Sequence, residues 1–348
     1  MPLPAPGPSP ADGWPRLSVV MTVRDEQRHL RACVQRVLDQ DYPGELEMVV
    51  AVGPSRDATA QIARDLEQRH PQLRLVDNPS GRTPAGLNAA LAAAGGEVVA
   101  RVDGHAMLPP GYLRRAVELL TETGAANVGG VMAAEGTTPF ERAVATAMTS
   151  PFGVGAGRFH YGGEPGPADT VYLGVFRREA LERAAGYDES FLRAQDWELN
   201  HRIRGAGGTV WFTPELRVTY RPRPTLSALA RQYRDYGRWR RVVMRRHPDS
   251  VRLHYLAPPA AVVAVAAGSA LALAGRRIGL LAPVGYAASV LAAAGVAGRG
   301  LPVEVRLHLP LVFATMHGAW GYGFLTSPSD LGRTAGRPRP AGPRTAAA

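Results

Sequence analysis

The stretch "EVVARVDGHA" (Glu97–Ala106) decides the fold of this chain. Its apolar, β-branched run is short and ends at Asp103 and His105, which is typical of a buried strand that stops at a polar edge. Because these two residues are two positions apart on an extended chain, their side chains point the same way and are able to share one divalent cation. An Asp at a strand end also commonly caps the following turn, so the pair by itself leaves both interpretations open.

Similar apolar runs recur from Leu17 to about Ala133, and segments with helical spacing separate them. We expect strands at Leu17–Val23, Leu46–Val52, Leu73–Val76, Glu97–Asp103 and Asn127–Ala133, and helices over residues 25–40, 57–70, 84–94 and 110–122. Apolar strands that alternate with helices are typical of parallel strands covered on both faces. The sequence therefore predicts a doubly wound α/β domain that binds its ligands at the carboxyl ends of the strands.

The composition allows a large core and excludes several classes of protein. The chain has 348 residues, 45% of them hydrophobic, and its single cysteine, Cys33, excludes a disulfide framework and a thiol metal site. This cysteine usage fits a reducing compartment. All 40 basic residues are Arg and the net charge is +10, but no nucleic-acid-binding motif accompanies the charge. A basic face against anionic lipid explains the charge better than a nucleic-acid partner.

The two ends of the chain are expected to be disordered. Residues 1–16 are rich in proline and lack the apolar region of a signal peptide. We expect a disordered leader there, a catalytic domain over residues 17–224, and a disordered tail over residues 328–348.

Two C-terminal segments, Leu256–Gly275 and Ile278–Gly298, contain no charged residue. Each has the roughly 20 apolar residues that a membrane span needs, and Leu309–Ser327 is a third candidate. The alternative is a buried helical hairpin in a soluble protein. We expect membrane helices within residues 256–327, two of them or three.

Residues 225–255 precede the first of these spans and predict a basic, amphipathic helix at the membrane surface. By the positive-inside bias, its Arg cluster faces the cytoplasm. We therefore expect the protein in the inner (cytoplasmic) membrane, with its catalytic domain facing the cytoplasm.

The stretch "FLRAQDWELNHRIRGAGG" (Phe191–Gly208) has a carboxylate, Asp196, at the start of a predicted helix. The positive end of the helix dipole favours an ionised carboxylate, which suits a proton acceptor, and a plain helix cap is the alternative. Glu198 stands four residues before Arg202 and predicts a helix ion pair. Trp197 fits either a platform under a ligand ring or the core.

Five motifs occur in the order found in family 2 glycosyltransferases of the GT-A fold, and the chain resembles that family over residues 17–245. The motifs are "SVVMTVRDE", "GPSRDAT", "NPSGRTPAGLNAAL", "RVDGH" and "RAQDWELNHRIRGAGG". The stretches "NVGGVM", "FGVGAGRFH" and "DTVYLGVFRREAL" are most similar to the succinoglycan-biosynthesis glucosyltransferase branch. The resemblance implies a GT-A mixed sheet followed by C-terminal membrane helices.

The resemblance also implies roles for the residues at matching positions. Asp196 would be the catalytic base, and Asp103 with His105 would hold Mn²⁺ or Mg²⁺. The implied donor-binding residues are Thr22, Arg24, Glu26, Ser55, Asp57, Arg82, Asn88, Arg101 and Asp103. The implied acceptor or gating residues are Trp197, Gln232, Arg238 and Trp239, of which the last three are similar to a Gln-x-x-Arg-Trp motif with longer spacing.

The chain departs from the family pattern at several positions. Val52 and Gly53 stand where paired acids usually help to hold the base and the ribose of the donor nucleotide. His105 replaces the second Asp of the Asp-x-Asp motif, and Gln195 replaces the Glu before the catalytic Asp. Recognition of the base and choice of the metal are therefore the features that the family pattern specifies least.

The sequence predicts an inverting, metal-dependent, membrane-anchored glycosyltransferase. It would move a hexose, glucose from UDP-glucose, onto a lipid-linked saccharide in exopolysaccharide or cell-envelope glycan synthesis. An in-line displacement needs a cation at the leaving diphosphate and a base opposite it, so we expect Asp103 and Asp196 to flank one cleft. The alternatives are transfer to a polyprenyl phosphate and a non-catalytic nucleotide-sugar-binding membrane protein.

Overall fold

The computed structural model describes residues 13–155 and 158–332 of the chain. Contacts between Cα atoms divide the chain into two compact units. Within the described residues, the first unit holds residues 13–132 and 162–219, and the second holds residues 133–155, 158–161 and 220–332.

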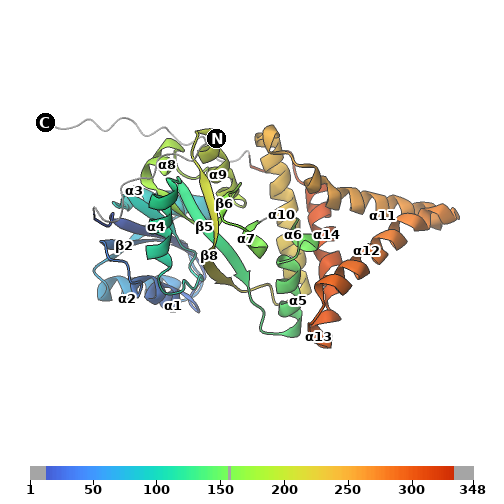
Figure 1. Cartoon of the computed structure of the whole chain (residues 1–348), viewed down its shortest axis with the longest axis horizontal. Coiled ribbons are helices and arrows are strands. Elements are labelled where there is room, and N and C mark those ends of the chain that lie inside the picture. Colours follow the sequence, from blue (N-terminus) through green and yellow to red (C-terminus); the bar gives the residue numbers. More distant parts are fainter. Residues whose placement is uncertain (1–12, 156–157, 333–348) are drawn as a thin grey trace. The chain divides into compact units, whose positions relative to one another are not determined.

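The first unit is built on one mixed sheet, which has eight strands in the described part of the chain (Figure 1). The strands are β1 (Leu17–Val23), β2 (Leu46–Val52), β3 (Leu73–Asp77), β4 (Val98–Arg101), β5 (Asn127–Ala134), β6 (Gly166–Pro167), β7 (Tyr172–Arg177) and β8 (Val210–Tyr220). Their spatial order is β3-β2-β1-β4-β7-β5-β8-β6. β1 pairs in parallel with β2 and β4, β2 pairs in parallel with β3, and β7 runs antiparallel to β4 and β5. Five strands form up to residue 134 and the mixed sheet is confirmed, but β4 ends at Arg101, so that Asp103 and His105 lie in the turn after the strand and not on an extended chain.

Helices flank the sheet and build the second unit (Figure 1). The helices of the first unit are α1 (Leu30–Leu38), α2 (Thr59–Arg69), α3 (Thr83–Ala93), α4 (Tyr112–Thr123), α8 (Arg178–Arg183) and α9 (Gln195–Gly205). Those of the second are α5 (Pro139–Met148), α6 (Pro151–Val154), α7 (Arg158–Tyr161), α10 (Leu226–Arg246), α11 (Ala257–Leu273), α12 (Leu281–Ala297), α13 (Val303–Arg306) and α14 (Leu309–Leu325), with the 3-10 turns η2 (Pro248–Ser250), η3 (Leu253–Leu256) and η4 (Arg277–Leu280). Because α5 packs on α13 and α14, residues 133–155 and 158–161 belong to the second unit, whereas the predicted catalytic domain included them.

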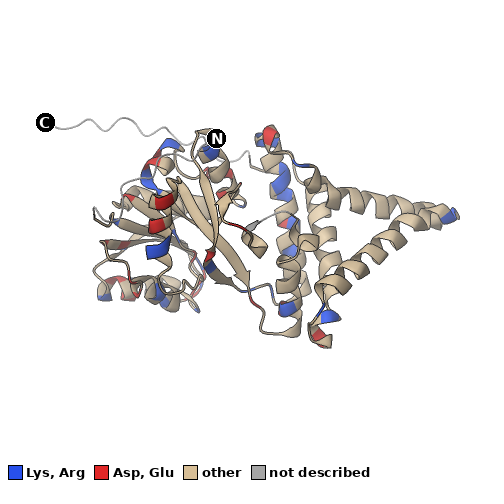
Figure 2. Cartoon of the chain, viewed as in Figure 1, with Lys and Arg blue, Asp and Glu red and all other residues tan. Residues whose placement is uncertain are grey.

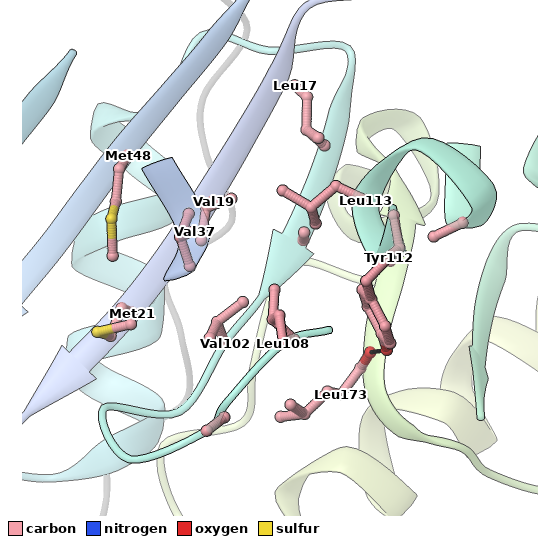
Figure 3. Packing of buried hydrophobic residues seen from close by; sticks show 14 of the residues in the cluster. Leu17, Val19, Met21, Val37, Met48, Val102, Leu108, Tyr112, Leu113 and Leu173 are labelled. Atoms are coloured by element: carbon pink, nitrogen blue, oxygen red, sulfur yellow. Dashed lines mark hydrogen bonds between the residues drawn. The ribbon is translucent and has the colours of Figure 1, made fainter. Parts of the chain in front are cut away.

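The core of the first unit lies on both faces of the sheet, because successive strand residues point to opposite sides. Leu17 and Val19 of β1 join the same buried cluster as Leu113 of α4 (Figure 3). Thr22, on the other side of β1, lies against Gly86 of α3. The sheet is therefore doubly wound, as the sequence predicts.

The first unit includes the end of the expected leader. The Trp14 ring meets the Tyr42 ring edge-on, with centroids 5.4 Å apart, and Tyr42 Oη donates to the Pro15 carbonyl at 2.5 Å. These residues are part of the fold. Residues 1–12, and all but the start of the predicted tail over residues 328–348, lie outside the described residues.

The second unit contains a close packing of α10 on α14. Gly237 of α10 lies against the Trp320 backbone, and Gly323 of α14 lies against the Arg234 carbonyl, so that neither glycine has room for a Cβ atom. The buried residues of α10 are Leu229, Tyr233, Gly237, Trp239, Val242 and Val243. The predicted basic amphipathic helix forms, but part of its apolar side covers α14 instead of lying free for a membrane surface.

Part of the Arg cluster of α10 binds the C-terminal end of α14. Arg241 Nη1 donates to the carbonyl oxygens of Phe324 (3.0 Å) and Leu325 (3.2 Å), and Arg245 Nη2 donates to that of Pro328 (2.8 Å). Cations are favoured at a helix C-terminus, where carbonyl groups lack intrahelical partners. Local capping therefore explains some of the basic charge that we expected to lie against anionic lipid.

Two helices of the second unit, Leu253–Leu273 and Arg277–Ala297, are long and apolar enough to cross a membrane. Figure 2 shows both without charged residues along most of their length. Only 11% and 17% of the most apolar 18-residue stretch of each helix is buried, whereas a hairpin in the core of a soluble protein would be covered. The third candidate span forms α14, which has buried residues along its length and is not among these two helices.

Candidate active site

Arg101, the last residue of β4, lies between two carboxylates. Its side chain is 7% exposed. Nη2 lies 2.8 Å and Nε 3.2 Å from Asp103 Oδ1, and Nη1 binds Asp196 Oδ1. One guanidinium thus links the turn after β4 to the first turn of α9. The two carboxylates that we expected at one cleft share the same partner.

The backbone at the start of α9 determines where Asp196 lies. Ala194, the residue before the helix, has a left-handed conformation (φ 59°, ψ 17°), which residues other than Gly, Asn and Asp rarely adopt. Strained backbone of this kind is concentrated at functional sites. Asp196 is the second residue of α9, so the plain helix cap is excluded for it. Its side chain is 40% exposed and is accessible to a ligand.

Glu198 and Trp197 stabilise α9 itself. Glu198 is 2% exposed and forms two bonds with Arg202, at 2.7 and 2.6 Å, which confirms the predicted ion pair. Arg202 also donates to the Ala184 carbonyl. Trp197 is 8% exposed and stacks on His201, with ring centroids 5.1 Å apart. The core interpretation therefore fits Trp197 better than a platform under a sugar.

The turn after β4 holds the two predicted metal ligands. Burial opposes the charge of Asp103, but Arg101 and His105 hold the pKa of its carboxyl below the ordinary value. His105 Nδ1 lies 2.9 Å from Glu26 Oε1. The buried Cys33 thiol donates to the Asp103 carbonyl at 3.3 Å. The turn is thus fixed by its neighbours, and Asp103 is ionised at neutral pH.

This turn supplies only part of the coordination shell of a divalent cation. Among the described residues, no three His, Cys, Asp or Glu side chains gather as possible metal ligands. Oδ1 of Asp103 already pairs with Arg101, and His105 pairs with Glu26. In nucleotide sites Mg²⁺ takes many of its ligands from phosphate and water. The two side chains Asp103 and His105 therefore fit a cation that binds together with a diphosphate.

The loops after β1 and β2 are joined by reciprocal hydrogen bonds. Asp25 Oδ1 accepts from the Arg56 amide (2.7 Å), and Ser55 Oγ accepts from the Asp25 amide (3.2 Å). Asp57 Oδ2 accepts from the Gln27 amide (3.1 Å). Asp25 has a left-handed φ of 57°, which Asp tolerates as Asn does. Ser55 and Asp57, both predicted to bind the donor, shape this pair of loops.

The other predicted donor residues differ in exposure. Arg24 and Arg82 are exposed near the carboxyl ends of the parallel strands, where cations are available to phosphate. Asn88 instead exchanges hydrogen bonds with the Tyr187 backbone, at 2.8 Å in each direction. Its amide therefore anchors the segment that leads to α9.

A cavity of about 410 Å³ lies at the carboxyl ends of β2 and β3. Its lining residues are Val52, Gly53, Pro54, Ala60, Arg64, Leu75, Val76, Asp77, Asn78 and Pro79. Val52 and Gly53, at the positions of the missing acids, give it an uncharged wall, while Asp77 provides a carboxylate from β3. The buried Asn78 donates to Thr22 Oγ1 at 3.3 Å, which connects the cavity to a predicted donor residue.

Two residues of this region received no role in the sequence analysis. Arg193 is exposed and adds to the lowering of the Asp103 pKa, after the larger effects of burial, Arg101 and His105. Asp77 lines the cavity from the end of β3. Each had a signal in the sequence: Arg193 lies in the motif that contains the proposed base, and Asp77 ends a strand.

The predicted acceptor or gating residues of α10 belong to the second unit. Gln232 Nε2 donates to the hydroxyl oxygens of Tyr220 and Tyr236, both at 2.8 Å, and Trp239 is buried. Arg238 lies on the same helix. The gating role of these residues stays a prediction.

Comparisons with known proteins agree with this architecture. A family model described as Glycosyl transferase family 2 matches residues 18–184. Succinoglycan biosynthesis protein ExoA of Rhizobium meliloti (strain 1021) is 32% identical over 320 residues, which are 90% of this chain and 96% of that protein. The chain belongs to glycosyltransferase family 2.

Two further comparisons agree with the family and with the fold. The dolichyl N-acetyl-alpha-D-glucosaminyl phosphate 3-beta-D-2,3-diacetamido-2,3-dideoxy-beta-D-glucuronosyltransferase of Methanococcus voltae is 21% identical over 66% of this chain and 74% of that protein. Mannosyltransferase PcManGT from Pyrobaculum calidifontis, solved with GDP-Man and Mn2+, has a TM-score of 0.58 and 23% identity over 94% of this chain and 90% of that chain. The predicted GT-A fold is confirmed, and the family 2 chain is a glycosyltransferase of polysaccharide or glycan biosynthesis.

Proposed function

We propose that this family 2 glycosyltransferase is an inverting, metal-dependent enzyme that transfers glucose from UDP-glucose to a lipid-linked saccharide, in exopolysaccharide or cell-envelope glycan synthesis. The main support is the guanidinium of Arg101, which binds both Asp103 and Asp196. An activated sugar needs charge neutralisation at its diphosphate and a proton acceptor on the opposite side. The two groups suited to these tasks meet at one side chain.

Asp196 is the proposed base. In a single in-line displacement, its carboxylate takes the proton of the acceptor hydroxyl while the hydroxyl oxygen attacks the anomeric carbon and the nucleoside diphosphate leaves. The 40% exposure of the side chain gives the acceptor access to it. The ion pair with Arg101 restricts the orientation of the carboxylate, and restricted orientation lowers the entropic part of the barrier.

Asp103 is the proposed ligand for a divalent cation, which supplies charge neutralisation at the leaving diphosphate when it is bound. Arg24, Arg82 and Arg193 are exposed cations of the same unit, and we assign them to the phosphates because guanidinium groups bind phosphate in a two-bond geometry. The Mn2+ and GDP-Man in the PcManGT complex support a metal-assisted nucleotide-sugar reaction on this fold.

The cavity at the ends of β2 and β3 is the proposed nucleobase site. Its apolar residues suit a planar ring, and the Asp77 carboxylate accepts hydrogen bonds only. Uracil and guanine both carry a ring N–H group that donates to a carboxylate, whereas the ring nitrogens of adenine and cytosine on the corresponding edge accept. Asp77 therefore favours a UDP or GDP donor, and the resemblance to the succinoglycan branch favours UDP.

The acceptor is proposed to be lipid-linked because the chain has two helices suited to a membrane. The helices Leu253–Leu273 and Arg277–Ala297 are apolar and largely exposed, and lipid covers such surfaces without loss of hydrogen bonds. The name of the Methanococcus voltae relative specifies a dolichyl phosphate-linked acceptor. We propose the inner membrane as the location, with the catalytic unit facing the cytoplasm.

Turnover by the full chain in detergent tests the proposal. UDP-glucose, other UDP-sugars and GDP-mannose are offered with Mn²⁺ or Mg²⁺, with a lipid-linked saccharide fraction or a polyprenyl phosphate as acceptor, and the products are identified by mass spectrometry. The expected product is a lipid-linked saccharide extended by one hexose, with no reaction after chelation. A single sugar on polyprenyl phosphate would establish the alternative acceptor. Donor binding without turnover on any acceptor would leave only the non-catalytic alternative.

A further inference from the structure

Arg101 differs from the other arginines predicted to bind the donor. Arg24 and Arg82 are exposed, whereas the Arg101 side chain is 7% exposed. Its Nε and Nη2 bind Asp103 Oδ1, and its Nη1 binds Asp196 Oδ1. Its charge is thus already paired with two carboxylates, and little of its surface is open to a donor phosphate.

We propose that Arg101 is a positioning residue that holds the Asp196 carboxylate in the orientation needed for transfer. The inference rests on the proposed function, because Asp196 acts as a base only in that reaction. The guanidinium is planar, so the two bonds to Asp103 fix the direction in which Nη1 points. All four residues of β4 are buried, so Arg101 holds Asp196 from a strand inside the sheet.

The contacts of α9 argue against a merely structural role for this ion pair. The helix is fastened through Glu198 and Arg202, and Trp197 is buried beside them. These residues hold the helix body, whereas Arg101 contacts a half-exposed carboxylate in its first turn. The effect of Arg101 is therefore expected on the reaction of Asp196 more than on the stability of α9.

Arg101→Lys tests the role, because an ammonium group keeps the charge beside Asp103 but cannot bridge two carboxylates as a planar fork does. We expect kcat to fall about 30-fold or more, while the affinity for UDP with Mn²⁺, measured by calorimetry, changes less than about threefold. The affinity for GDP with Mn²⁺ is measured in the same way, because Asp77 suits guanine as well as uracil. In a background of Asp196→Asn, Arg101→Lys is expected to have no further effect on kcat, since a residue that acts through Asp196 loses its role with it.

Arg31→Lys is the matched comparison, because Arg31 also pairs with an Asp, Asp65, but has no role in the proposed site. It is expected to leave both kcat and KM for the donor within about twofold. Thermal melting checks each variant, and Arg101→Gln replaces Arg101→Lys if the latter does not fold.

Two results would overturn the inference. One is a large loss of UDP–Mn²⁺ affinity with an unchanged kcat, which would make Arg101 a donor ligand. The other is an effect of Arg101→Lys that multiplies with that of Asp196→Asn, which would make the two residues independent. A wild-type chain that turns over no nucleotide sugar would instead contradict the proposed function, and this inference with it.

Discussion

Asp103 and Asp196 bind the same guanidinium, although one follows β4 and the other begins α9. The two carboxylates share the single positive charge of Arg101, so the cluster of three side chains is net negative when all are ionised. A site of this kind favours a cation on the side of Asp103 and still leaves an exposed carboxylate at Asp196.

Replacing Asp196 with Asn removes the proposed base while preserving the shape of the side chain. We expect kcat to fall about 10²- to 10⁴-fold, which is the usual contribution of general base catalysis, with the affinity for UDP and Mn²⁺ nearly unchanged. Initial rates with UDP-glucose and calorimetric titration measure the two quantities. Full activity of this variant would remove Asp196 from the mechanism.

Glu198→Gln is predicted to affect stability and not chemistry. The variant leaves Arg202 without the anion that binds it through two hydrogen bonds, and breaking a buried pair costs roughly 3–5 kcal/mol. The melting temperature should fall by about 10 °C, while kcat of the folded protein stays the same. Glu179→Gln is the control, because Glu179 forms an exposed pair with Arg183 and should change little. A loss of kcat at normal stability would give Glu198 a role in the reaction.

Glu47 makes the stability of the first unit depend on pH. Burial raises the pKa of its carboxyl. Hydrogen bonds from Ser18 Oγ and the Gly95 amide, both 2.5 Å, and the charge of Arg16 lower the pKa by more than burial raises it, so it lies below the ordinary 4.5. A group with a lowered pKa stabilises the fold above the ordinary value, and this stability is lost as the pH falls through the folded value. Glu47→Gln should therefore be less stable by about 2 kcal/mol at pH 7.

Urea unfolding of the wild type and Glu47→Gln between pH 3 and pH 7 measures this dependence. The difference between them should shrink below a pH of 4.5, where the carboxyl becomes protonated. The exposed Glu45→Gln serves as the control. A difference that is constant over the whole range would show that the charge of Glu47 is unimportant.

Asp77→Asn should weaken nucleotide binding through the base. Loss of a hydrogen bond to a charged group costs about 1.5–3 kcal/mol, so KM for the donor should rise about ten- to a hundredfold with kcat unchanged. Asp65→Asn, on α2 and paired with Arg31, is the control. Equal affinity of wild type and Asp77→Asn for UDP would place the base elsewhere.

Gly323→Ala should destabilise the second unit. The added methyl group would lie inside contact distance of the Arg234 carbonyl oxygen and would force α14 away from α10. Gly318→Ala on the same helix has no atom within 4 Å and should be neutral or stabilising by up to about 1 kcal/mol, because Ala is the better helix former. Melting in detergent distinguishes the two variants. Equal melting temperatures would mean that the two helices are not closely packed there.

The parallel part of the fold was predictable from the sequence because each strand is a local apolar run. The start of α1 was not: the helix expected from Asp25 begins at Leu30. Asp25 is left-handed, and the amides of Glu26 and Gln27 donate to Thr59 at the start of α2 and to Asp57 in the loop before it. A partner 30 positions away leaves no local pattern, so helical periodicity alone placed the boundary too early.

The sequence predicted which residues belong to the candidate site better than it predicted the contacts between them. The motifs identified Asp103 and Asp196, but they gave Arg101 a role in donor binding and no link to Asp196. Its burial between the two carboxylates depends on how α9 meets the edge of β4. For α14, composition alone does not separate a helix that spans a membrane from one that packs on a neighbouring helix.

The buried position of Cys33 has a practical consequence. It is the chain's sole thiol, and its Sγ binds the carbonyl of Asp103, while burial raises its pKa to about 12. An alkylating reagent therefore reacts with it only during excursions that loosen the segment following β4. The rate of Cys33 labelling in the native, untagged enzyme therefore measures how often that segment opens, with and without nucleotide.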